Sequence, residues 1–217
     1  MLMTSSPASR FHHSLDAFCF TYRNAAGNPD MIKIELNYSL RAHILASDER
    51  KLTTDAFGES ISVLTVDPVE IYAAKANALL SRAAARDLYD FNLMIENNLF
   101  DNQKDLLRKC IVFYATISQE APDPSFSTSA IDSLTFQKIR RDLFPVLKYE
   151  ERNKRFDLES MKTPAKDYLN SLMHLTDSEK DYISRFMAKE YRPELLFDDP
   201  GILHRIVKHP MASWKCR

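Results

Sequence analysis

The 217-residue sequence has very little glycine: Gly27, Gly58 and Gly201 are its only three, and they are far apart. Glycine makes up about 7% of an average protein, so the depletion is strong. Phosphate-binding loops of the P-loop and Rossmann kinds need two or three glycines within a few residues. The sequence therefore excludes both of these nucleotide-binding loops within this chain.

Cysteine is also scarce, and Cys19, Cys110 and Cys216 are odd in number and widely spaced. This pattern favours reduced thiols over a disulfide framework. No apolar run is long enough to span a membrane, and the first ten residues lack the apolar core of a secretory signal. We expect a soluble, cytoplasmic protein that makes no membrane contact.

The chain has almost no net charge, because 29 Lys and Arg residues stand against 30 Asp and Glu. This balance argues against a protein that coats a polyelectrolyte, although it leaves room for a local basic patch. Hydrophobic residues make up 45% and charged residues 27%, which is typical of a globular chain of this length.

The first part of the chain has the two-residue period of β-strands. Residues 15–22 and 31–38 alternate around a turn-forming cluster at 24–30, which predicts an antiparallel hairpin. Residues 60–66 predict a further strand, and residues 40–45 are a candidate for a short one.

From residue 67 onward the apolar spacing is helical. Asp67 is expected to cap the first helix and Pro68 to occupy its first turn. Residues 121–129 are expected to form a linker. The expected helices cover residues 67–81, 86–97, 101–118, 132–150, 156–173, 176–190 and 200–207. The sequence predicts an α+β protein in three parts, 1–66, 67–120 and 121–217.

One acidic residue stands out in the expected strand 31–38. Alternation places Ile34 and Leu36 on one face and Glu35 on the other. If the two apolar neighbours are buried, Glu35 is held rigidly away from the core, as suits a ligand for Mg²⁺. The alternative, which is commoner for an arbitrary strand, is a solvated sheet face with a cross-strand ion pair.

A row of cations follows in residues 67–90. Lys75, Arg82 and Arg86 fall on one stripe if the helix continues past residue 81, and such a stripe suits a phosphate-bearing ligand. Asp87 could orient a basic group, contact a metal or cap the following helix. The alternative is an exposed basic face with partners on its own helix.

We assign no chemical role to the remaining features of the sequence. Aromatic residues such as Phe136, Phe144 and Tyr149 are expected to be core. The charge-rich run 148–155 is expected to be solvated, and only secondarily a nucleic-acid contact. No set of histidines has the spacing of a metal site.

Three segments resemble the nucleotidyltransferase AbiEii/AbiGii toxin family of type IV toxin–antitoxin systems. They are IKIELNYSLRAHI (32–44), DPVEIYAAKANALL (67–80) and SRAAARDLYD (81–90). The resemblance covers the chain from about residue 11 onward. It implies a partial polymerase-β-like nucleotidyltransferase sheet in residues 1–66, with an antiparallel or mixed arrangement. Helices in 67–120 would complete the active-site region, and 121–217 would form a helical C-terminal region.

The resemblance also implies an activity and a set of roles. A nucleotidyl group would pass from an NTP to an acceptor, with RNA such as tRNA as the candidate. Glu35 would be a catalytic residue and the ligand of Mg²⁺ or another divalent cation. Lys75 and Asp87 would be catalytic, and Lys75, Arg82 and Arg86 would bind the nucleotide. The implied partner is a cognate antitoxin from the same operon, not necessarily in direct contact with this chain, in the setting of abortive infection and phage defence.

One part of the family's pattern has no counterpart. A Gly-Ser turn and a D-x-D strand are expected ahead of Glu35, whereas Asp16 is a lone acid there. Two-metal phosphoryl transfer needs several convergent carboxylates, so we expect this chain by itself to be weak or inactive, as a truncated reading frame or a degenerate copy. The alternative function is a non-catalytic helical module that binds an antitoxin or RNA.

Overall fold

The computed structural model describes residues 10–12, 15–37, 42–53, 58, 60–118, 124–152 and 157–217. The protein is α+β, with its strands in the first 65 residues and helices from residue 68 onward. This confirms the expected fold class. The chain divides into two compact units, Met1–Ala42 and His43–Arg217, and each is described by itself. The three-part division expected from the sequence stays a prediction.

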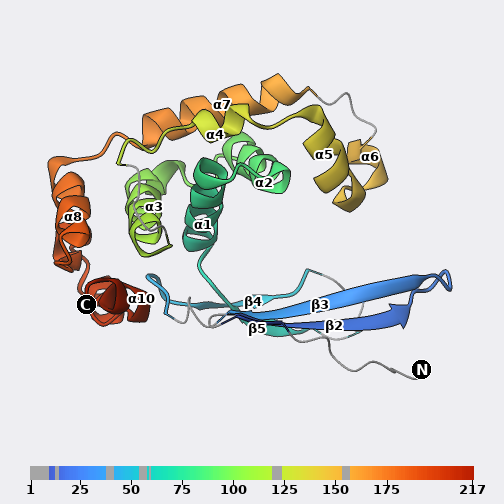
Figure 1. The fold of residues 1–217 in the computed structure, drawn as a ribbon, viewed down its shortest axis with the longest axis horizontal. Coiled ribbons are helices and arrows are strands. Elements are labelled where there is room, and N and C mark those ends of the chain that lie inside the picture. Colours follow the sequence, from blue (N-terminus) through green and yellow to red (C-terminus); the bar gives the residue numbers. More distant parts are fainter. Residues whose placement is uncertain are drawn as a thin grey trace. The chain divides into compact units, whose positions relative to one another are not determined.

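The first unit contains an antiparallel sheet in the order β1-β2-β3. Its strands are Arg10–His12 (β1), Leu15–Arg23 (β2) and Pro29–Asn37 (β3). The long hairpin of β2 and β3, drawn in blue in Figure 1, confirms the prediction from alternation. Its register places Phe18 opposite Ile34.

The hairpin turn is organised by the side chain of Asn24. Its Oδ1 accepts hydrogen bonds from the backbone N–H groups of Ala26 and Asn28, both at 3.1 Å. Gly27 adopts a φ of +78°, a conformation that a side chain would disfavour. Arg23 donates a hydrogen bond to the Gly27 carbonyl oxygen at 2.8 Å. The turn chemistry thus fixes the register that the alternating pattern requires.

One face of this sheet is apolar and about half exposed. The exposed fractions of Ile32, Ile34 and Leu36 on β3 are 48%, 47% and 45%. None of the side chains described in the first unit is fully buried. The expectation that Ile34 and Leu36 anchor into a core is therefore wrong within this unit, because its described strands supply no second layer to cover them.

The second unit begins with a small two-stranded sheet. Strand β4, Asp48–Lys51, pairs antiparallel with β5, Ser62–Thr65. The sequence predicted β5 but missed β4, because DERK has no apolar residue to show a period. The short strand suggested at 40–45 is absent from residues 42–45, and residues 40 and 41 lie outside the described chain.

Helices form the body of the second unit. They are Pro68–Ser81 (α1), Ala85–Glu96 (α2), Lys104–Ser118 (α3), Ser129–Asp132 (α4), Phe136–Asp142 (α5), Tyr149–Arg152 (α6), Leu158–Leu172 (α7), Asp177–Met187 (α8), Pro200–Ile206 (α9) and Pro210–Lys215 (α10). Figure 1 shows α7 running from the corner formed by α5 and α6 toward α8. Within the described residues, no helix is long and apolar enough to cross a membrane.

The single helix expected over residues 132–150 is wrong. The chain forms α4, α5 and α6 instead. Thr135 caps a new helix, α5, by accepting a hydrogen bond from the Lys138 N–H. Pro145 then prevents this helix from continuing, because proline lacks the backbone N–H that a helix interior needs. The sequence also missed α10, which Pro210 starts. Of the linker expected at 121–129, residues 121–123 lie outside the described chain.

A buried carboxylate secures the entry into α1. Glu70 is 2% exposed and accepts hydrogen bonds from the backbone N–H groups of Ile44 and Leu45 at 3.1 and 2.9 Å. It also accepts one from the hydroxyl of Tyr114 on α3, and its Oε1 lies 3.1 Å from His43 Nδ1. Burial, together with this hydrogen bond, raises the pKa of Tyr114. The carboxylate therefore joins residues 43–45, α1 and α3.

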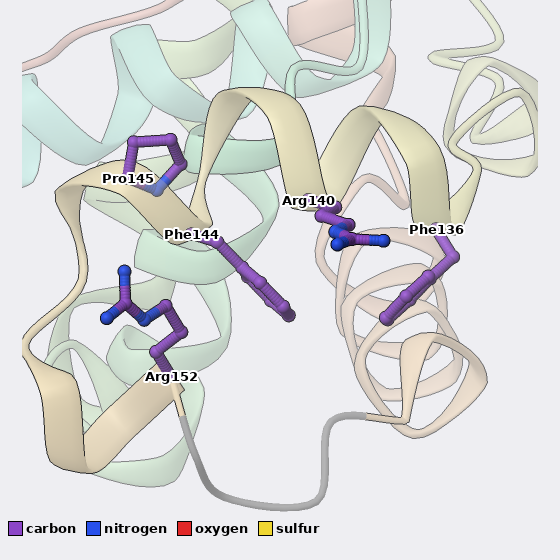
Figure 2. A pocket seen from close by; sticks show the side chains of 5 residues that line it. All are labelled: Phe136, Arg140, Phe144, Pro145 and Arg152. Atoms are coloured by element: carbon purple, nitrogen blue, oxygen red, sulfur yellow. The ribbon is translucent and has the colours of Figure 1, made fainter.

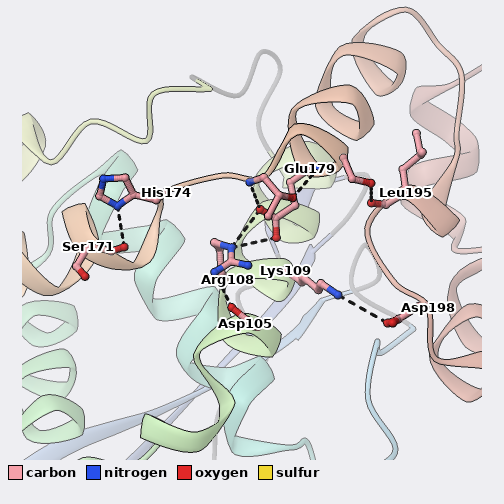
Figure 3. Close-up of polar contacts among 10 residues, drawn as sticks. Asp105, Arg108, Lys109, Ser171, His174, Glu179, Leu195 and Asp198 are labelled. Carbon is pink, nitrogen blue, oxygen red and sulfur yellow. Dashed lines mark hydrogen bonds and ion pairs between the residues drawn. The ribbon is translucent and has the colours of Figure 1, made fainter.

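A second buried carboxylate joins α3 to α8 (Figure 3). Arg108 Nε donates to both oxygens of Glu179, at 3.0 and 3.1 Å. Glu179 is 1% exposed and also accepts a hydrogen bond from the Thr176 N–H, which completes a capping box at the start of α8. One side chain thus satisfies a helix terminus and a neighbouring helix.

The last two helices are tied to earlier parts of the second unit. Arg205 on α9 donates a hydrogen bond to the carbonyl oxygen of Ile44 at 2.8 Å. Lys215 on α10 donates one to the carbonyl oxygen of Thr116 on α3 at 3.2 Å. Ile206 is fully buried, so α9 contributes apolar area as well as a polar tie.

Candidate functional site

The start of α1 is as the sequence predicted, and it determines where Lys75 lies. Asp67 caps the helix by accepting a backbone hydrogen bond at 2.8 Å, and Pro68 occupies the first turn. The helix packs against α3, with Ala73 and Ala76 fully buried. Lys75 is consequently placed on the flank of α1, with 30% of its side chain exposed.

Lys75 reaches across to α2 and forms an ion pair with Asp90. The distance from Nζ to Oδ2 is 2.6 Å, and the Asp90 side chain is 36% exposed. Tyr72 lies one turn before Lys75, and its pKa is raised by burial and by the charge of Asp90, while Lys75 acts in the opposite direction. The group is therefore a partly buried ammonium–carboxylate pair beside a tyrosine.

Asp90 is a residue to which sequence reasoning assigned no role. The available signal was its position three residues after Asp87, because residues three apart share a helix face. Both carboxylates of the RDLYD segment do pair with cations contributed by the α1 side.

The second ion pair joins Arg82 and Asp87. Arg82 Nη2 lies 3.2 Å from Asp87 Oδ2, and the two side chains are 70% and 11% exposed. Asp87 belongs to the first turn of α2, where the helix dipole stabilises a negative charge. A mostly buried carboxylate thus holds a guanidinium that extends into solvent.

The continuous stripe of cations does not form. α1 ends at Ser81, and Ala83 adopts a φ of +47° between the two helices. Arg86 lies on α2, where its Nε donates a hydrogen bond to the carbonyl oxygen of Asp142 at 2.8 Å. Lys75, in the middle of α1, and Arg82, just after its end, each pair with a carboxylate of α2. We call the four residues Lys75, Arg82, Asp87 and Asp90 the α1–α2 elbow.

Glu35 belongs to the first unit and is 45% exposed. The ammonium of Lys33, two residues earlier on β3, lies 2.5 Å from its carboxylate. This solvated setting with an ion pair is closer to the alternative interpretation of the strand than to a carboxylate between buried neighbours. Asp16 is paired with Leu36, so alternation directs it to the face opposite Glu35.

The described residues do not fit a two-metal centre. They contain no group of three or more His, Cys, Asp and Glu side chains placed to hold a metal ion. In its own unit Glu35 offers a single carboxylate that already pairs with Lys33. Two-metal catalysis places ions about 3.5–4 Å apart and needs several ligands.

Comparison with protein families gives a match over most of the chain. The nucleotidyl transferase AbiEii toxin family, of the type IV toxin–antitoxin system, matches residues 6–192. The chain belongs to this family. The matched region includes the whole α1–α2 elbow, and membership makes the chain a nucleotidyltransferase-type toxin with an implied cognate antitoxin. Comparisons with curated proteins and with solved structures found no match.

Proposed function

We propose that this AbiEii-family chain takes part in transferring a nucleotidyl group from an NTP to a hydroxyl acceptor on RNA, and that the α1–α2 elbow binds the triphosphate. The observation that supports this proposal is the 2.6 Å pair of Lys75 and Asp90. The pair holds the Lys75 ammonium in a defined position that solvent can reach. A ligand that carries more negative charge than Asp90, such as a triphosphate, can compete for this ammonium.

The chemistry explains why cations are needed. In nucleotidyl transfer the acceptor oxygen attacks the α-phosphorus of the NTP. The bond between the α-phosphorus and the oxygen that bridges it to the β-phosphorus breaks, and pyrophosphate leaves. Catalysis of phosphoryl transfer is mostly positioning and charge stabilisation. Lys75 and Arg82 neutralise the triphosphate, and Arg86 is a further phosphate contact once it leaves the Asp142 carbonyl.

The carboxylates of the elbow act through these cations. Asp90 holds the Lys75 ammonium on the correct flank of α1 before the nucleotide binds. Asp87, which is mostly buried, orients the Arg82 guanidinium so that its planar fork can meet a phosphate. Asp87 is therefore a positioning residue in this proposal.

Glu35 remains our proposed ligand for a divalent cation such as Mg²⁺, which when bound offsets phosphate charge. We assign it no step, because the described residues contribute one carboxylate there. For the same reason we expect weak or no transfer by this chain alone.

The test measures NTP binding by the full chain, either by calorimetry or by displacement of a fluorescent nucleotide. Lys75→Ala should weaken binding about 10- to 150-fold, the equivalent of one charge-assisted contact. Lys166→Ala is the matched control, because Lys166 is 31% exposed and also pairs with an aspartate, Asp132, at 2.8 Å. Equal affinity of the two variants would refute the proposed role of Lys75.

The alternative function is a non-catalytic module that binds the antitoxin or RNA. The observation in its favour is the insufficient carboxylate set of the described residues. Incubation with labelled NTPs, Mg²⁺ and total RNA separates the two functions. RNA binding without nucleotide binding or label incorporation would select the module.

A further inference from the structure

A pocket of about 600 Å³ on the second unit holds some of the exposed aromatic residues of the chain. It is lined by Phe136, Arg140, Phe144, Pro145 and Arg152 (Figure 2). Phe136 is 49% exposed and the nearby Tyr149 is 68% exposed, so the expectation that they are core residues is wrong. The rings of Phe136 and Phe144 meet edge to face with centroids 5.9 Å apart. These rings therefore already cover part of each other.

A more open set of apolar side chains lies on β3 in the first unit. Each of residues 31–36 is exposed, and the four apolar ones among them are 45–56% exposed. On β2, by contrast, residues 16–20 are all partly buried. Of the two long strands, β3 is thus the one that is open to a partner.

The place of β3 in its sheet points the same way. Among the described strands the order is β1-β2-β3, so β3 has a neighbour on one side only. It is nine residues long and has no proline after Pro29. A strand in this position directs half of its backbone N–H and C=O groups away from its neighbour, and such an edge is a template for pairing with another chain.

The sequence of β3 is complementary to itself when two copies run antiparallel. With Ile34 opposite Ile34 of the second copy, Ile32 lies opposite Leu36 and Lys33 lies opposite Glu35. The apolar residues then form one continuous face across both copies, and the other face carries two pairs of opposite charges. Opposite charges across neighbouring strands stabilise a sheet.

The neighbouring registers lack this match. A shift that sets Lys33 against Lys33, or Glu35 against Glu35, brings like charges together, which is unfavourable. A shift by one residue sets Lys33 against Ile34 and mixes the two faces. Parallel pairing in register again places Lys33 beside Lys33. Charge and alternation therefore favour the same arrangement, which is antiparallel and centred on Ile34.

The two charged side chains remain accessible although they already form a pair within one copy. Lys33 Nζ lies 2.5 Å from Glu35 Oε1, and the side chains are 51% and 45% exposed. Two copies in this register bring four charges of alternating sign together on one face of the sheet.

We infer that β3 is a homodimer interface, through which two copies of this chain pair edge to edge. The sheets of the two copies become one continuous sheet. The contact is isologous, as a closed two-fold dimer requires, because each residue meets the same counterpart in both directions. The inference goes beyond the proposed function and does not depend on the α1–α2 elbow. Edge pairing leaves the faces of the sheet open, so it is compatible with the role proposed for Glu35.

The test measures the mass of the full chain by sedimentation equilibrium at concentrations up to about 100 μM. Wild type should reach twice the mass of a single chain. Lys33→Glu should weaken dimerisation about 5- to 50-fold, because both cross-strand pairs then carry like charges. Arg50→Glu is the matched control and should stay within about twofold of wild type. Arg50 is also 51% exposed, and it pairs with Asp48 two residues away on β4.

A mixture of two variants separates a specific interface from a folding defect. Lys33→Glu and Glu35→Lys should each dimerise poorly alone, since like charges meet across the interface in both cases. In an equimolar mixture every cross-strand pair again joins opposite charges. The mixture should therefore form a heterodimer with an affinity within about threefold of wild type.

The register has a test of its own. Ile34→Cys should form a disulfide between two copies on air oxidation, because directly opposite residues have Cα atoms about 4.5–5.5 Å apart. Ile32→Cys should not, because its counterpart is Leu36. Peptide mass spectrometry distinguishes this bond from any that involves Cys19, Cys110 or Cys216.

A monomer over the whole concentration range would overturn the inference. So would a dimer that Lys33→Glu leaves intact, an equal loss in Arg50→Glu, a mixture that stays monomeric, or equal cross-linking at positions 32 and 34. Lys75→Ala should leave the dimer unchanged while it weakens NTP binding. Failure of the dimer and failure of the proposed function are thus read from different measurements.

Discussion

The two units of this chain bury their side chains to very different extents. In the second unit, α3 is buried along most of its length, and even charged groups such as Glu70 and Glu179 are enclosed with their partners. In the first unit none of the described side chains is fully buried, and the apolar residues of β3 remain about half exposed. Since burial of apolar area is the main source of stability, the helical unit should supply most of the free energy of folding.

The largest expected effect comes from the same substitution in the two units. Ile111→Ala on α3, where the side chain is fully buried, should lower the free energy of unfolding by about 2–5 kcal/mol. Ile34→Ala on β3 should lower it by less than about 1 kcal/mol, because half of that side chain is already in water. Urea unfolding followed by circular dichroism measures both. Similar losses would mean that the sheet face is covered.

A smaller effect is expected from a second matched pair. Glu70→Gln should destabilise the protein by about 2–3 kcal/mol, because an amide cannot accept all the hydrogen bonds that the buried carboxylate accepts. Glu35→Gln, on the exposed strand, should change stability by less than about 0.5 kcal/mol. The same unfolding measurement applies. A Glu70→Gln variant as stable as wild type would show that this carboxylate does not secure the entry into α1.

Cys19 and Cys110 should differ in their reactivity toward an alkylating reagent. Near neutral pH we expect no accompanying change in the stability of the protein. Burial, with a contribution from Glu70, raises the pKa of Cys110, whereas Cys19 is only partly buried. Because the thiolate is the nucleophile, iodoacetamide at about pH 8 should modify Cys19 first and Cys110 only after unfolding. Peptide mass spectrometry reads out both sites. Early modification of Cys110 would contradict its enclosure in α3.

The raised pKa of Cys110 also determines the direction in which stability changes with pH. Folded Cys110 keeps its proton where an unfolded thiol, with a pKa near 8.5, loses it. Its contribution to stability is therefore complete below about pH 8 and declines as the pH rises above that value. Cys110→Ala should flatten the alkaline part of the stability curve.

Local chemistry made much of the fold predictable. The hairpin followed from alternation and the turn at Asn24, and α1 followed from Asp67 and Pro68. Strand β4 was not predictable, because four charged residues show no period and only pairing with β5 defines it. The break after Asp132 does not follow from the apolar spacing, which suits a continuous helix, and it depends on the cap at Thr135 and the stop at Pro145.

The site was predictable in part for similar reasons. The sequence singled out Lys75, Arg82 and Asp87, and in the structure Arg82 pairs with Asp87 while Lys75 pairs with Asp90. The pairing of Lys75 with Asp90 depends on the angle between two helices, which no local pattern contains. The open face beside Glu35 was missed because alternation shows which residues share a face, but it does not show whether another layer covers that face.

The tie between Arg205 and Ile44 has a practical consequence for anyone who trims this gene. The family match covers residues 6–192, yet α9 and α10 lie beyond that range and are tied to Ile44 and to α3, respectively. A recombinant fragment that ends at residue 192 would lack both helices. The carbonyl oxygen of Ile44 would then lose its hydrogen-bond donor, Arg205. The range of the family match and the extent of the second folded unit therefore differ in this chain.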